Sequence, residues 1–134
     1  MVKRGASIGF FGIFGRSEDM NRLDEALRQA GLHPGHVPEG AKLAAVTLMS
    51  RQDPEPPPAA YPPVGELMAF CILGEEDFLH LNGQARLAAI TGRLEEALEA
   101  GEGQDAELIL LMLHAGLIHA RLVDRYDIRA EGAE

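Results

Sequence analysis

The sequence contains no tryptophan, only two tyrosines and a single cysteine among its 134 residues. Because Cys71 is alone, neither an intrachain disulfide nor a cysteine-based zinc site can form. Cys71 falls on an apolar helical stripe, so we expect a small buried side chain rather than a reactive thiol. The scarcity of aromatic rings leaves few platforms on which bases or sugars could stack.

Positive charge is also scarce. Twelve Lys and Arg residues stand against 21 Asp and Glu, which gives a formal net charge of −9. Phosphate groups would be repelled, so we expect no nucleic-acid partner and no binding to an anionic membrane surface. Residues 53–107 hold two basic against twelve acidic residues. This acidic middle could steer a basic partner or a second copy into contact, although such acids most often form a solvated helix face.

No hydrophobic run reaches the ~18 residues of a transmembrane helix. His114 and His119 interrupt the longest candidate, and the apolar N-terminal stretch is too short and too rich in glycine for a secretory signal. We therefore predict a cytoplasmic protein without a membrane span. The ten arginines against two lysines and the abundant alanine hint at a bacterial source.

The spacing of apolar residues predicts an all-α fold, a single compact domain of five or six helices over residues 17–127. The predicted helices span 17–30, 39–51, 63–73, 84–100 and 105–126, with a short helical piece at 75–81. Residues 104–123 are apolar on most sides, so we expect the last helix to lie at the centre of the core. Six prolines within residues 53–63 predict an extended, polyproline-like crossover between the two halves.

Two terminal segments flank the predicted domain. Residues 1–16 place Phe10, Phe11 and Phe14 among four glycines, a composition that disfavours a helix. We interpret this segment as an arm, which either packs on its own core or reaches a second subunit. Residues 128–134 are predicted to fray.

A row of polar side chains follows the predicted C-terminal helix. Glu107, His114, Arg121 and Arg125 fall within about 40° of one another at 100° per residue. The row is either the helix face left to water or, alternatively, a subunit interface or a small anion site that uses Arg121 and Arg125. Leu110 and Leu111 lie beside it, so the row is expected to be half exposed.

Sequence motifs for catalysis, metal binding or cofactor binding are lacking. His114 and His119 point about 140° apart on a helix, which prevents them from sharing one metal ion. The sequence contains no GxSxG elbow, P-loop, HExxH or EF-hand loop. We expect neither metal nor cofactor. One enzymatic hypothesis remains, in which His114 acts as a base and Arg121 as an anion clamp within one cleft.

These observations favour a small non-enzymatic interaction or regulatory protein that works as a homodimer or with another protein. An alternative is a pocket for a small, mostly apolar ligand between the helix at 63–73 and the C-terminal helix, lined by Met68, Met112 and His119.

Overall fold

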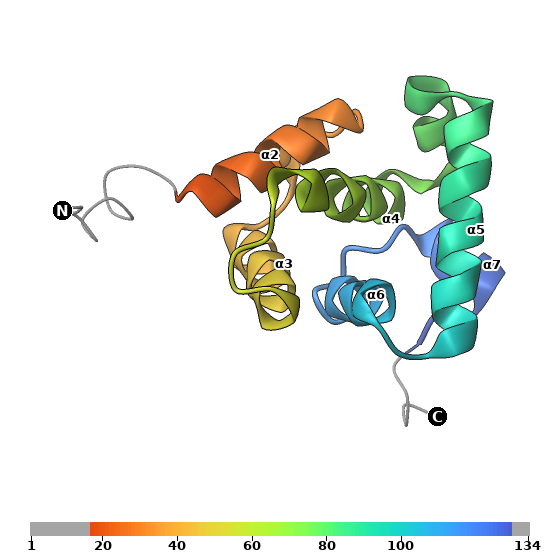
Figure 1. The fold of residues 1–134 in the computed structure, drawn as a ribbon. Helices are drawn as coiled ribbons and strands as arrows, with labels where there is room; N and C mark the ends of the chain where they lie inside the picture. The colour runs from red at the N-terminus through yellow and green to blue at the C-terminus, as the bar shows by residue number, and fades with distance from the viewer. Residues whose placement is uncertain (1–16, 130–134) are drawn as a thin grey trace, which may run out of the picture.

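The computed structural model describes residues 17–129, and its elements confirm the all-α prediction (Figure 1). The α-helices are α2 (Glu18–Gln29), α3 (Glu39–Gln52), α4 (Tyr61–Asn82), α5 (Gln84–Ala100), α6 (Gln104–His114) and α7 (Ala120–Tyr126). Two short 3-10 helices, η1 (Pro34–His36) and η2 (Pro58–Ala60), lie in the connections. The predicted arm with Phe10, Phe11 and Phe14 lies outside the described residues.

Local capping interactions set several of these boundaries. The Ser17 hydroxyl accepts a hydrogen bond from the Met20 N–H at 3.2 Å and thereby caps α2. After α2 the chain turns through Gly31, which has a φ of +94°, and the Leu32 N–H donates back to the Leu27 carbonyl at 3.0 Å. This pattern is a Schellman motif, which stops a helix where a residue can adopt a left-handed conformation. The predicted first helix is confirmed.

Helix α4 contains a kink at Gly74. This residue has φ +84° and ψ 174°, so the helix ends there and restarts at Glu75, as the sequence predicted. A kink releases carbonyl groups from the helical hydrogen bonds. The Cys71 carbonyl instead accepts the His119 N–H at 2.7 Å, and the His119 ring lies so close that a Cβ at position 74 would be 2.9 Å from it. The kink and the segment before α7 therefore hold each other in place.

The core is built around α4, which packs against α2, α5, α6 and α7. Its inner side chains are buried, including Leu67, Met68 and Phe70. At Gly65 the backbones of α4 and α2 come together, since a Cβ there would lie 2.5 Å from the Ala26 Cβ. The buried Lys42 ammonium of α3 donates to the Asp24 carboxylate of α2 at 3.0 Å.

The single helix predicted over residues 105–126 is wrong. The chain leaves α6 after His114 and turns at Gly116, which has a φ of +71°, before α7 begins at Ala120. The Leu117 N–H donates to the Met112 carbonyl at 3.0 Å, which is again a Schellman motif. Gly116 ends the helix, but the long apolar run before it led us to predict that the helix continues.

Two further expectations need correction. The proline-rich segment is extended only in part, because η2 occupies Pro58–Ala60 and α4 begins at Tyr61 with Pro62 and Pro63 in its first turn. Proline fits the first turn because the N–H groups there have no helical partner. Ile128 was placed in the fraying tail, yet it is buried. No helix within residues 17–129 is long and apolar enough to span a bilayer.

Candidate interaction surface

A groove runs between α3 and α6, which lie beside each other below α4 in Figure 1. Its volume is about 790 Å³. Both walls have the i, i+3, i+4 spacing of one helix face. The lining residues are Gly40, Leu43, Ala44, Thr47, Leu48 and Arg51 from α3 and Glu107, Leu110, Leu111 and His114 from α6. We call this surface the α3–α6 groove.

Two large apolar side chains on opposite walls of the groove face water. Leu43 of α3 is 57% exposed and Leu110 of α6 is 40% exposed. Leu43, Val46 and Met49 share the apolar spacing of α3, but only Val46 and Met49 are buried. Helix α3 therefore carries apolar side chains on two sides, one packed in the core and one lining the groove.

The two charged residues of the groove, Arg51 and Glu107, lie together at one end of it. Arg51, in the last turn of α3, contacts Glu107 in the first turn of α6, with 3.4 Å between Nη2 and Oε1. This contact places the end of α3 beside the start of α6. Both side chains are about half exposed or more, at 67% and 48%, so the pair contributes at most about 1 kcal/mol to stability. His114 lines the same groove and is exposed.

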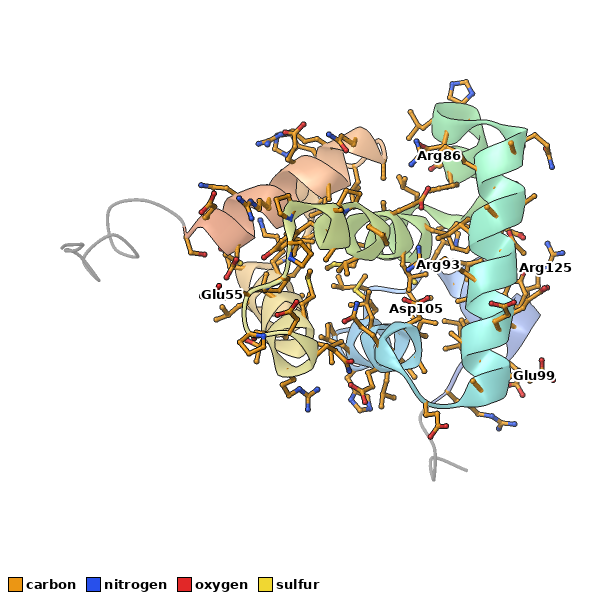
Figure 2. The ribbon with its side chains drawn as sticks, in the orientation of Figure 1. Glu55, Arg86, Arg93, Glu99, Asp105 and Arg125 are labelled. Carbon is orange, nitrogen blue, oxygen red and sulfur yellow. The ribbon has the colours of Figure 1, made fainter. Side chains whose placement is uncertain are left out.

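A second ion pair holds α6 in its place along the groove. The Arg93 guanidinium of α5 donates two hydrogen bonds to the Asp105 carboxylate, at 2.9 and 3.0 Å. Figure 2 shows the two side chains pointing toward each other between α5 and α6. A two-point contact of this kind fixes orientation as well as distance. It therefore sets the first turn of α6, from which Glu107 projects into the groove.

The predicted polar row is divided between two surfaces. Glu107 and His114 line the α3–α6 groove, whereas Arg121 and Arg125 line a second hollow of about 780 Å³ beside the Gly74 kink. There Arg125 donates to both carboxylate oxygens of Glu75 at 2.8 Å. The break at Gly116 causes this division, since the row existed only on a continuous helix. His114 and Arg121 thus do not share the cleft that the enzymatic hypothesis required.

The residues proposed for an apolar ligand pocket line no common hollow among the three described. Met68 and Met112 have no exposed surface and line neither the groove nor the second hollow. His119 lines the second hollow and caps α7, where its Nδ1 accepts the Arg121 N–H at 3.1 Å. A third hollow of about 330 Å³ lies between the end of α5, α6 and Ile128, without any of the three residues.

The titratable residues of the described chain offer no metal centre. Within residues 17–129, no group of three His, Cys, Asp or Glu side chains is arranged to hold a metal ion. Burial raises the pKa of the Cys71 thiol to about 12, so the nucleophilic thiolate is disfavoured at neutral pH.

Comparison with known proteins does not identify a function for these surfaces. We found no match to the chain among protein-family models, curated proteins or solved structures.

Proposed function

We propose that the protein is a small, non-enzymatic interaction protein of the cytoplasm that associates with a second copy of itself through the α3–α6 groove. The observation that carries this proposal is the exposure of Leu43 and Leu110 on facing walls of one groove. Covering such side chains releases free energy in proportion to the apolar area removed from water, roughly 25 cal/mol for each Å².

The chemistry of the groove supports contact with a protein rather than with a small polar substrate. Its walls are mostly leucine, alanine and threonine, and its charged side chains occur at the ends of the two helices. Contiguous exposed apolar surface with a polar rim is typical of protein contact sites.

The size of the surface sets the expected strength of association. Packed helices in general have axes roughly 8–10 Å apart, so two helices of 14 and 11 residues present a face of roughly 20 by 20 Å. This area lies below the ~800 Å² per partner of a standard interface, which predicts a weak dimer that depends on protein concentration.

Light scattering coupled to size exclusion, over a wide range of protein concentrations, tests the proposal. The wild type should move from the monomer mass toward the dimer mass as concentration rises. The double variant Leu43→Gln/Leu110→Gln should remain monomeric, because two glutamines restore a polar face at little cost in helix propensity. Leu81→Gln is the matched control, since Leu81 is 51% exposed at the end of α4 and does not line the groove. A wild type that stays monomeric throughout would refute self-association.

A further inference from the structure

We infer that the two copies meet groove to groove about a two-fold axis parallel to α3 and α6, so that Arg51 of each copy pairs with Glu107 of the other. This inference rests on the proposed self-association and specifies its geometry.

The position of the intramolecular ion pair leads to this arrangement. Arg51 and Glu107 lie at the same end of the groove, one on each wall, 3.4 Å apart. A two-fold axis that runs along the groove places α3 of one copy over α6 of the other and keeps the same ends together. The Arg51 side chain then lies opposite Glu107 of the second copy, and the reciprocal contact follows from the symmetry. An axis across the groove would instead set α3 on α3 and place Arg51 at the wrong end.

The charge of the groove favours a second copy as the occupant. The whole chain carries −9, so two copies repel each other over most of their surfaces. Within the groove the fixed charges are one arginine and one glutamate, which sum to zero. A surface with one cation and one anion on opposite walls is complementary to itself when it is turned by 180°. A strongly basic partner would find its complement in the acidic residues elsewhere, not in this groove.

Arg51 and Glu107 are exposed enough to contact a second copy. Arg51 is 67% exposed and Glu107 48% exposed, so neither is fixed by surrounding packing. Each can keep its contact within the copy and add a second contact across the axis. The four charges then alternate in sign around the end of the interface, which stabilises the pairing and sets its register.

Two single charge reversals give a test that depends on the contact between copies. Arg51→Glu makes the charged end of the groove wholly negative, and Glu107→Arg makes it wholly positive. Each variant alone should lose at least about tenfold in dimer affinity, because like charges now face each other across the axis. An equimolar mixture should form a one-to-one heterodimer at concentrations where both single variants are monomeric. Native mass spectrometry distinguishes this heterodimer, and circular dichroism melts establish that both variants fold.

The outcomes separate this inference from the proposed function. If the wild type is monomeric, self-association itself fails. If the wild type dimerises and both variants dimerise equally well, the reciprocal Arg51–Glu107 arrangement is overturned, and the Leu43→Gln/Leu110→Gln variant then shows whether the groove is still the contact surface. If those variants still dimerise while Phe10→Ser/Phe11→Ser/Phe14→Ser in the full chain does not, the N-terminal segment makes the contact, which also overturns it. Loss in both variants without recovery in the mixture would likewise refute reciprocal pairing.

Discussion

Replacement of Gly65 by alanine should destabilise the protein, although alanine is the better helix former. Gly65 is buried in α4 against α2, and a Cβ there would lie 2.5 Å from the Ala26 Cβ, 2.8 Å from the Ala26 carbonyl carbon and 3.0 Å from the Leu27 nitrogen. Two of these three atoms belong to the backbone, so no side-chain rotation relieves the overlap. Helix α2 must move away from α4, which opens the packing between them.

The size of the effect follows from two opposing contributions. In a helix interior, glycine to alanine gains about 1 kcal/mol through reduced backbone entropy of the unfolded chain and better helix propensity. Overpacking a core typically costs about 1–3 kcal/mol, and contact with rigid backbone places this site near the upper end. The expected net loss is about 1–2 kcal/mol, or roughly 4–8 °C in Tm for a domain of this size.

Gly92 provides the matched control for this experiment. It also lies inside a helix, α5, but a Cβ at this position would meet no atom within 4 Å. Gly92→Ala should therefore show the propensity gain alone and raise the stability by about 0.5–1 kcal/mol. Both changes are measured by urea unfolding with intact far-UV circular dichroism as the check on folding. If Gly65→Ala were as stable as the wild type or more so, the close approach of α2 and α4 would be wrong.

Two further predictions concern buried polar groups. Burial raises the pKa values of Cys71 and Tyr61 to about 12, and the Tyr61 hydroxyl also donates to the Asp19 carboxylate at 2.7 Å. A raised pKa stabilises the folded state fully at pH values below the usual pKa of 9 to 10. This stabilisation is lost as the pH rises toward 12, and for Cys71 it amounts to about 4 kcal/mol. The free energy of unfolding, measured with urea, should thus fall from pH 9 upward in the wild type and fall less steeply in Cys71→Ala. An equal fall in the wild type and the variant would contradict the contribution assigned to Cys71. Lys42→Met should cost more than about 1 kcal/mol, because it removes a buried ammonium that contacts Asp24 at 3.0 Å and Glu39 at 3.1 Å. Arg22→Met, which breaks the more exposed pair with Glu18, should cost less than about 1 kcal/mol, and similar losses in the two variants would refute the difference.

The candidate surface was only partly predictable from the sequence. Glu107 and His114 were identified as a polar row with leucines beside it, and both line the α3–α6 groove. The opposite wall was not predicted, because Leu43 shares the apolar spacing of its helix with Val46 and Met49, which are buried. A signal was present in α3, where apolar and small side chains occur on more than one face. Such a pattern does not by itself tell which face a neighbouring helix covers.

The sequence alone determined the helices whose ends depend on local interactions. Ser17 caps a helix through an N–H three residues away, and Gly31 and Gly74 permit positive φ angles that end a helical segment. These effects act within one turn, so they can be recognised without knowledge of the fold. Gly116 acts in the same way, and only the apolar residues before it led to a different prediction.

The tertiary structure decided which apolar residues remain in contact with water. Helix α4 packs against α2, α5 and α6. Helices α3 and α6 contact each other but leave Leu43 and Leu110 on the two walls of a groove. Arg51 and Glu107 come together across 56 positions of the chain. Side-chain periodicity specifies the faces of each helix, but burial depends on contacts between residues far apart in the sequence. For this reason the polar row predicted on one helix became parts of two separate surfaces.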